Sequence, residues 1–448
     1  MAYLEWSRAC TARVRESHVQ SLGARAQELS LRLAREVDAG LLPFLRMGYV
    51  ETLKRDMPRL VEKTRPYKHM LVLGIGGSAL GTRAMQKAFA RGVDMPGHGG
   101  HEGKQIWIAD NVCPTTLGDW FKLLDPQRTV VVTISKSGGT IETISQYFLA
   151  REWLQKALGE AWKDHMIVVT DEAKGFLREE AREHGLDSLE VPDNLGGRYS
   201  ALSAVGLLPA AFLGIDWEAL LEGAASLARP LVENPGSLAT HPSMALASWA
   251  KALEDYGYTD LIFFCYEPLF AMYGPWFAQL WAESLGKEGL GTMPVPATGV
   301  TDQHSVNQMF LDGIRNKACL FVTSSRHNSG PTFPAALPKG WEFLSGKPFS
   351  CLLEAEALGT RMALSMHDVP LVQICLDDAS EKSGGKLMML LEIATVLTGW
   401  LMGINPLDQP AVELGKRLAN ARLGKPGYAE EEALLERYLK TAEKRQDF

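Results

Sequence analysis

The stretch from residue 129 to residue 140 reads TVVVTISKSGGT and joins two kinds of sequence. Its first seven residues, Thr129–Ser135, are β-branched or small and carry no charge. An uninterrupted run of this kind is typical of a strand covered on both faces, as in a parallel sheet. The residues that follow are rich in hydroxyls and glycine and precede a helical pattern. We therefore predict a buried strand that delivers a polar loop to the N-terminus of a helix.

Similar apolar runs recur along the chain, each followed by glycine or polar residues and then by a helical pattern. Before residue 205 they are His69–Ile75, Gln105–Asp110, Thr129–Ser135 and Met166–Asp171, and after it Leu261–Tyr266, Ala318–Ser324 and Val369–Leu376. Strands that alternate with helices form βαβ crossovers and hence parallel sheets. Two such sets predict two α/β domains of similar kind, although no sequence repeat links them.

The length of 448 residues allows two or three domains. We expect a helical segment over residues 1–45, with its clearest amphipathic part at Ala24–Leu41, and a first α/β domain over residues 46–205. A second α/β domain is expected over residues 206–405, and a helical segment over residues 406–448.

Composition narrows the class of protein. Hydrophobic residues make up 46% of the chain and charged residues 22%, which is ordinary for a folded protein. The net charge of −7 argues against nucleic acid or an anionic membrane as the main partner. The six cysteines are widely spaced and form no CxxC pair, so we expect reduced thiols in a cytoplasmic protein. Charged residues near the N-terminus predict that no signal peptide is present.

Two stretches need a separate interpretation. Leu387–Ile404 has Glu392 as its only charged residue and is barely long enough to span a bilayer, so we expect a buried helix. Residues 93–104 contain His98 and His101 among glycines. Two histidines without further ligands nearby favour a solvated surface loop, and we expect no metal site.

A glycine-rich segment, Gly74-Ile75-Gly76-Gly77-Ser78, follows the first predicted strand, with Gly81 after it. Glycines let backbone N–H groups approach a ligand closely, and a helix N-terminus favours an anion or polar oxygens. A dinucleotide site, and with it a dehydrogenase, is the alternative. It would need an acid about 20 residues further on, whereas Asp110 lies 36 residues after Gly74.

The segment that begins at Ser135 carries the stronger signal, because Ser135–Thr140 places three hydroxyls and two glycines where a helix begins. Hydroxyls and free N–H groups at such a position can hold a phosphate, and a lysine adds charge if it points inward. A simple helix cap would need only one of these hydroxyls. We therefore expect a phosphate site formed by Ser135, Lys136, Ser137 and Thr140.

Four further residues could do chemistry. Arg198 follows paired glycines that suit a tight turn, and its guanidinium could bind an oxyanion or lie at the surface. Glu283 ends an aromatic helix and could act as a general base, although most such glutamates are solvated caps. His304 lies in a polar loop and is suited to proton transfer near neutral pH. Lys416, one turn after a proline start, would alone be a surface charge.

Taken together and in this order, these segments resemble the glucose-6-phosphate isomerase family. The most specific pieces are DNLGGRYSALSAVG at 193–206 and VELGKRLA at 412–419, which look like the two signature patterns of the family. GIGGSALG, SKSGGTIET, ESLGKEG and TDQHS match further family blocks with compatible spacing. The resemblance runs from about residue 70 to residue 420, and the length suits the shorter, bacterial-type branch.

The resemblance implies two sugar-isomerase (SIS) domains, each a mainly parallel sheet flanked by helices, with the active site between them. It implies reversible conversion of glucose 6-phosphate to fructose 6-phosphate, a step of glycolysis and gluconeogenesis, without a cofactor. Glu283 would move a proton between C2 and C1 through a cis-enediol, and Arg198 would stabilise the enediolate. His304 and Lys416 would open the sugar ring.

The same resemblance assigns the substrate contacts and the assembly. Ser135, Lys136, Ser137 and Thr140 would hold the phosphate, and Gly77, Ser78 and Gln409 the sugar end. In this family the histidine reaches the site from the neighbouring subunit, which implies a homodimer. Gly138-Gly139 replaces bulkier residues of the animal-type branch. A non-catalytic sugar-phosphate regulator is the alternative, but such a protein could lose Glu283, His304 or Lys416, and all three are present.

Overall fold

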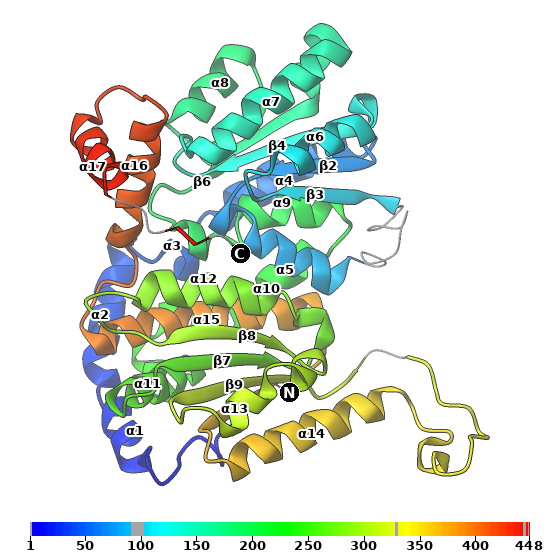
Figure 1. Cartoon of the computed structure of the whole chain (residues 1–448), viewed down its shortest axis with the longest axis vertical. Coiled ribbons are helices and arrows are strands. Elements are labelled where there is room, and N and C mark those ends of the chain that lie inside the picture. The colour runs from blue at the N-terminus through cyan, green and yellow to red at the C-terminus, as the bar shows by residue number, and fades with distance from the viewer. Residues whose placement is uncertain (1, 91–102, 328–329, 442–444, 447) are drawn as a thin grey trace.

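A computed structural model of the chain describes residues 2–90, 103–327, 330–441, 445–446 and 448. It contains two five-stranded sheets with layers of helices on either side of each (Figure 1). His98 and His101 lie outside the described residues, so the expectation for that loop stays a prediction.

The first sheet is parallel throughout and has the strand order β3-β2-β4-β5-β6. Its strands are β2 (His69–Leu73), β3 (Gln105–Ala109), β4 (Thr129–Ser135), β5 (Met166–Asp171) and β6 (Asp187–Val191). The chain moves to one side of β2 for β3 and to the other side for β4. The loops that follow β2 and β4 therefore separate at the carboxyl edge of the sheet, which is where open α/β sheets bind ligands.

The second sheet repeats this arrangement with the order β8-β7-β9-β10-β1. Its strands are β7 (Asp260–Cys265), β8 (Met293–Thr298), β9 (Lys317–Ser324), β10 (Leu371–Leu376) and β1 (Tyr3–Glu5). The first four are parallel to one another, whereas β1 pairs with β10 in the antiparallel direction. The predicted α/β class with mainly parallel sheets is confirmed, and the N-terminal residues add an edge strand that the sequence patterns did not indicate.

Helices form the layers between and outside the sheets. One face of the first sheet is covered by α6 (Pro114–Leu123), α7 (Ile141–Leu158) and α8 (Phe176–His184). The far face of the second sheet is covered by α13 (Asn307–Asp312) and α14 (Ser350–Met366). Between the sheets lie α4 (Val50–Thr64), α5 (Leu80–Phe89), α9 (Ala204–Phe212), α10 (Trp217–Glu233), α11 (Pro242–Asp255), α12 (Tyr273–Leu285) and α15 (Glu381–Met402).

The strand β2 shows why the central strands read as continuous apolar runs. Met70 and Val72 belong to the large core between the sheets, whereas Leu71 and Leu73 belong to the cluster beneath the outer helices. Successive side chains of a strand point to opposite faces, and both faces are covered here. Every position of this strand after His69 is consequently buried.

The predicted apolar helix at Leu387–Ile404 is the buried helix α15. Among the described residues it is the one helix long and apolar enough to span a membrane, and 89% of its most apolar window is buried. It packs closely against α10, because a Cβ atom at Gly223 would lie 1.9 Å from the carbonyl oxygen of Lys382. The length and apolar composition of α15 are thus explained by its position in the core between the sheets.

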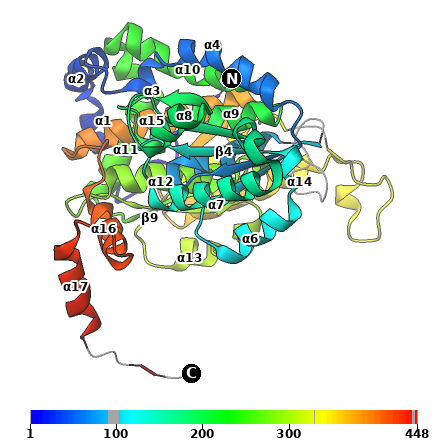
Figure 2. The same cartoon turned by 90° about the horizontal axis from the view of Figure 1, so that it is seen from above.

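The ends of the chain differ in detail from the expected helical segments. Residues 1–45 hold β1, α1 (Glu16–Gly23), α2 (Ala26–Asp38) and the start of α3 (Pro43–Arg46), so this region is not one helix. The boundary expected at residues 205–206 falls inside α9. At the other end, α16 (Glu413–Arg422) and α17 (Ala429–Leu439) pack on one another, and α17 projects away from the rest of the chain (Figure 2).

Candidate active site

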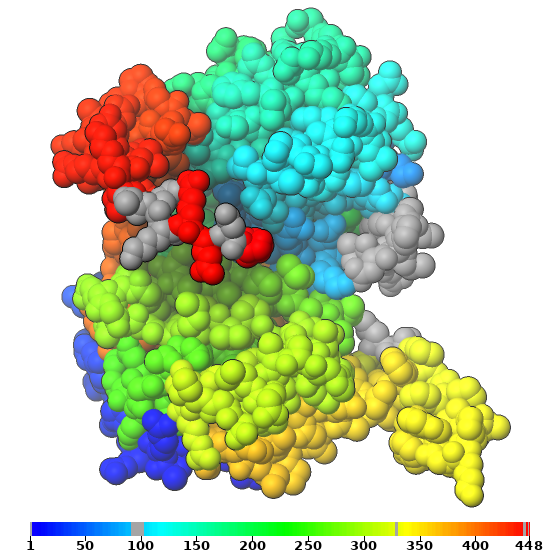
Figure 3. Space-filling model, in the orientation of Figure 1, coloured from blue at the N-terminus to red at the C-terminus, as the bar shows by residue number. Residues whose placement is uncertain are grey.

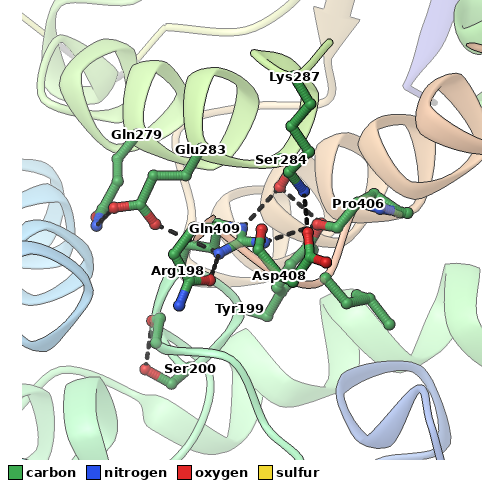
Figure 4. A network of polar contacts seen from close by, with 12 residues as sticks. Arg198, Tyr199, Ser200, Gln279, Glu283, Ser284, Lys287, Pro406, Asp408 and Gln409 are labelled. Carbon is green, nitrogen blue, oxygen red and sulfur yellow. Dashed lines mark hydrogen bonds and ion pairs between the residues drawn. The ribbon is translucent and has the colours of Figure 1, made fainter. Parts of the chain in front are cut away.

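Arg198 is the centre of a polar network between the two sheets (Figure 4). It lies in a short 3-10 turn, Gly197–Tyr199, and its side chain is only 2% exposed. The guanidinium donates five hydrogen bonds. Nε donates to Ser284 Oγ at 2.7 Å, and Nη1 donates to Glu283 Oε2 at 3.4 Å and to Gln409 Oε1 at 2.7 Å. Nη2 donates to the carbonyl oxygens of Pro406 at 2.7 Å and Asp408 at 3.0 Å. A buried charge is tolerated when its donors are satisfied in this way.

Three segments distant in sequence therefore converge on one side chain. The acceptors come from α12 and from the turn at 405–409, which follows α15. The turn lies more than 200 residues after Arg198 along the chain, with a separation of 208 residues to Pro406. Since the guanidinium is planar and its donors have fixed directions, these contacts determine the orientation of its positive charge.

Glycine allows the loop after β2 to reach this network. A Cβ atom at Gly77 would lie 2.3 Å from the carbonyl carbon and oxygen of Gly197 and 2.8 Å from the amide nitrogen of Arg198. No other residue fits at that distance, so Gly77 and Ser78, in the 3-10 turn Gly76–Ser78, lie directly against the arginine-bearing turn. Gly81 meets the same segment, because a Cβ atom there would be 2.6 Å from Ala201 Cβ.

These contacts also account for the glycines that suggested a dinucleotide site. Gly77 and Gly81 are required by the close approach of residues 197–201 of the same chain. The spacing in this segment thus has a packing explanation that needs no nucleotide.

Glu283 lies on α12 beside the guanidinium. One carboxylate oxygen contacts Arg198, and the other accepts a hydrogen bond from Gln279 Nε2 at 3.2 Å. Gln279 is four residues earlier, so both side chains project from one face of the helix (Figure 4). The carboxylate remains 32% exposed. It is therefore held from two sides yet accessible to a small molecule.

The hydroxyl-rich loop after β4 lies at the same edge of the first sheet as the loop after β2. Ser135 Oγ is 3.0 Å from Thr140 Oγ1 and 3.5 Å from Ser137 Oγ, and the last two oxygens are 3.4 Å apart. The three hydroxyls therefore gather at the start of α7, where amide N–H groups also lack helical partners.

Lys136 lies between Ser135 and Ser137 in the chain and adds a positive charge to this loop. Burial lowers the pKa of Lys136 below its usual range. Within the described part of the chain, its ammonium group has no hydrogen bond or ion pair. A dianion bound at the hydroxyls would add a counter-charge to those of Asp171 and Asp193, which makes this loop suited to a phosphate group.

Two predicted site residues lie outside the network. His304 ends the 3-10 turn Thr301–His304 and is exposed. Lys416 lies on α16, where its ammonium pairs with Glu413 Oε1 at 2.8 Å and the side chain is 56% exposed. Neither residue contacts Glu283 or Arg198 within this chain. The structure thus brings together Gly77, Arg198, Glu283 and Gln409, and separates His304 and Lys416 from them.

Three participants were missed by the sequence patterns. Gln279 lies four residues before Glu283 on α12, so helical periodicity could have indicated it. Lys287 lies beyond the end of α12, and its contact with Asp408 joins segments distant in sequence. Ser284 is buried and contacts Arg198 Nε as well as the phenol of Tyr199, at 3.0 Å. Burial also raises the pKa of Tyr199. A serine beside a glutamate carries no signal for such a role.

Comparisons with known proteins agree with this arrangement. Residues 61–330 match the family described as phosphoglucose isomerase. The chain is 39% identical over 362 residues to the glucose-6-phosphate isomerase of Rubrobacter xylanophilus, covering 80% of this chain and 82% of the relative. It is 34% identical over 410 residues to that of Carboxydothermus hydrogenoformans, covering 87% and 85%. The chain therefore belongs to the phosphoglucose isomerase family.

Solved structures show the same fold. A hypothetical protein of Thermus thermophilus superposes with a TM-score of 0.83 at 32% identity, over 94% of this chain and 100% of the other. A glucose-6-phosphate isomerase of Chlamydia trachomatis superposes with a TM-score of 0.78 at 19% identity, over 98% and 92%. The paired-sheet architecture is thus shared along nearly the whole chain.

Proposed function

We propose that this chain catalyses the reversible isomerisation of D-glucose 6-phosphate and D-fructose 6-phosphate. The observation that supports it most is the contact between Arg198 and Glu283, with a phosphate-type loop at the same edge of the first sheet. Isomerisation of an aldose to a ketose needs a base beside the C1–C2 edge and a cation beside the oxygen that becomes negative. No cofactor is needed for either task.

In the proposed mechanism Glu283 takes the proton from C2 of the open-chain aldose and returns it to C1. The intermediate is a cis-enediol, and its negative charge develops on the oxygen nearest the guanidinium of Arg198. The guanidinium is already oriented by its five hydrogen bonds, so little reorganisation is required when the charge appears. Gln279 orients the carboxylate through Oε1.

The substrate contacts follow from the two loops at the sheet edge. Ser135, Lys136, Ser137 and Thr140 would bind the phosphate, and this local site lets a chain of net charge −7 hold a dianion. Gly77, Ser78 and Gln409 would contact the sugar end, since Gly77 abuts the turn of Arg198 and Gln409 accepts from its guanidinium.

Ring opening is assigned to His304 and Lys416, and it requires contacts beyond those of one isolated chain. Lys416 would exchange its contact with Glu413 for the substrate when α16 approaches the site. His304 would come from the partner subunit of a homodimer. We also propose a cytoplasmic location, because all six cysteines are free thiols.

An exposed apolar surface on α14 supports a dimer. Leu358, Met362 and Met366 recur every four residues along this helix and are 57%, 60% and 73% exposed. Gln303, next to His304, donates a hydrogen bond to Glu356 of the same helix at 2.6 Å. An exposed apolar stripe of this kind marks a protein interface. The segment before α14 projects from the body and carries the exposed, stacked rings of Trp341 and Phe343 (Figure 3).

A coupled assay tests the function: the purified chain should convert fructose 6-phosphate to glucose 6-phosphate, detected by a glucose-6-phosphate dehydrogenase. Glu283→Gln should lose most turnover but still bind substrate. Glu288→Gln, an exposed glutamate five residues later, is the matched control and should keep wild-type turnover. An inactive wild-type chain would refute the proposal.

Subunit mixing tests the shared site. Glu283→Gln and His304→Ala chains are each expected to be inactive alone. After mixing, heterodimers should regain activity, because one of their two sites combines an intact Glu283 with an intact His304. Full subunit exchange without recovered activity would show that His304 does not act across an interface.

A further inference from the structure

Lys287 joins the helix that carries Glu283 to the turn that holds Arg198. It lies four residues after Glu283, just beyond the end of α12 at Leu285. Its side chain is only 10% exposed, and its ammonium contacts Asp408 Oδ1 at 2.8 Å and the carbonyl oxygen of Asn405. Both partners belong to the turn at residues 405–409, of which Figure 4 labels Pro406, Asp408 and Gln409. Lys287 is therefore a direct link between α12 and this turn.

The turn at residues 405–409 is held by hydrogen bonds, an ion pair and close packing. Asn405 Oδ1 accepts from the amide of Leu407 at 3.1 Å, and its Nδ2 donates to Asp408 Oδ2 at 3.0 Å. The ammonium of Lys287 holds the pKa of Asp408 below its usual range. Pro406 packs on α15 at a position where only glycine fits, because a Cβ atom at Gly399 would be 2.7 Å from Pro406 Cβ. Its conformation is thus fixed by polar and steric contacts together.

Three acceptors of Arg198 come from this same turn. The carbonyls of Pro406 and Asp408 and the side chain of Gln409 all accept from its two Nη atoms, at 2.7, 3.0 and 2.7 Å. Asp408 therefore has two roles, since its carboxylate pairs with Lys287 while its carbonyl holds Arg198. A displacement of the turn would rotate the guanidinium relative to Glu283.

The burial of Lys287 indicates a role beyond stability. Taking an ammonium group out of water is costly, and pairing it with one carboxylate that is 54% exposed recovers only part of that cost. An apolar side chain would cap the helix end at lower cost. The ion pair does supply a directional link that an apolar contact cannot supply.

We propose that Lys287 is a positioning residue for the isomerase reaction: through Asp408 and Asn405 it fixes the turn whose acceptors aim Arg198 at the reacting oxygen beside Glu283. Lys287 does not touch the substrate in this role. The inference rests on the proposed function, because the aim of Arg198 matters only if charge develops beside Glu283.

The test compares Lys287→Met, which keeps the stem and removes the charge, with Lys287→Arg and with Lys251→Met. Lys251 is a matched control, since its side chain is 16% exposed and pairs with Glu254 and Asp255 on α11. Each purified full-length variant is assayed for kcat and KM with fructose 6-phosphate. Inhibition is measured with inorganic phosphate and with 5-phosphoarabinonate, whose planar carboxylate mimics the enediolate.

Lys287→Met should lower kcat roughly 10- to 100-fold, because a displacement of about 1 Å at the reacting groups has such an effect. The inhibition constant of 5-phosphoarabinonate should rise by a similar factor, whereas that of inorganic phosphate should stay within about twofold, since the phosphate loop lies apart from Lys287. Lys287→Arg should restore most of kcat. Adding Asp408→Asn to Lys287→Met should cause little further loss, because both changes break one link.

Lys251→Met should keep wild-type kcat even if its thermal midpoint falls. If Lys287→Met also keeps wild-type kcat and wild-type inhibition by 5-phosphoarabinonate while its thermal midpoint falls, Lys287 has a structural role only and the inference is wrong. Equal loss of affinity for both inhibitors would likewise contradict it. A wild-type chain without isomerase activity would instead refute the proposed function.

Discussion

Replacing Arg198 by lysine separates the charge of this residue from its geometry. The positive charge is kept, but five donors in a rigid fork are replaced by an ammonium group with three. At least two of the five acceptors around Arg198 must then lose their partner. The carbonyl of Pro406 is among the buried candidates, because Pro406 is itself buried.

The expected magnitudes follow from these contacts. A buried acceptor without a partner costs about 1 to 3 kcal/mol, so two such acceptors in Arg198→Lys should lower the free energy of unfolding by about 2 to 6 kcal/mol in total. Losing the oriented charge beside the developing oxyanion should lower kcat roughly 100- to 1,000-fold, which is the effect of removing one preorganised group that stabilises an oxyanion. The loss of turnover should therefore be far larger than a moderate loss of stability would produce at 25 °C.

The assay measures kcat and KM in both directions, alongside urea unfolding followed by circular dichroism. Arg151→Lys is the matched control, because Arg151 also pairs with a glutamate, Glu180, at 2.6 Å but lies on the outer helix α7. It should keep wild-type kcat. If Arg198→Lys is destabilised yet keeps kcat within about threefold of wild type, a positive charge alone is sufficient for turnover, and the claim that catalysis needs the fixed orientation of the guanidinium is refuted.

Three further outcomes are expected. Lys136→Met should raise KM about tenfold with a smaller change in kcat, because it removes one positive charge from the phosphate loop. Lys174→Met is the control: Lys174 is exposed and pairs with Asp193, so its replacement should leave KM unchanged. Burial lowers the pKa of His241 from 6.5 to about 4, so the unfolded chain binds a proton at this residue before the folded chain does. The free energy of unfolding should therefore fall by roughly 3 kcal/mol between pH 6.5 and pH 4. His241→Asn should remove most of this pH dependence, measured by urea unfolding at several pH values. Burial raises the pKa of Glu392, whose carboxyl oxygens have no hydrogen-bond partner among the described residues. The wild type should therefore lose stability relative to Glu392→Gln as pH rises above about 4.3, where the unfolded chain releases the proton first. A constant difference in the free energy of unfolding between the two chains from pH 4 to pH 8 would contradict this.

The central strands could be predicted from sequence because they are buried on both faces. Seven apolar runs correspond to β2, β3, β4, β5, β7, β9 and β10. The three strands that the patterns missed, β1, β6 and β8, are all at an edge of a sheet. An edge strand pairs on one side only and tolerates polar residues and proline; β8 contains Pro294 and Pro296.

The candidate site could be predicted in part because its residues follow strands or helices with recognisable spacing. The glycines before Arg198 and the position of Glu283 at the end of an aromatic helix are local features. The contacts of Arg198 with the turn at 405–409 are not local, since they join residues more than 200 positions apart. Sequence patterns carry no information on such a contact when both segments are irregular.

The isolated chain also explains why His304 and Lys416 stand apart. Both are exposed, and neither has a contact that would hold it near Glu283. Their proposed roles depend on a second subunit and on the approach of α16. For these two residues the sequence resemblance makes the stronger prediction, and the structure of one chain adds an exposed apolar surface on α14 that supports a dimer.

Proton exchange with solvent tests the role of Glu283 most directly. Fructose 6-phosphate is incubated with the chain in deuterium oxide, and proton NMR follows the signals of C1 of the ketose and C2 of the aldose. If Glu283 carries the proton through an enediol, the wild-type chain should introduce deuterium at these carbons. Glu283→Gln should lose exchange and isomerisation together, whereas Glu288→Gln should keep both. Unchanged exchange and isomerisation in Glu283→Gln would contradict this mechanism.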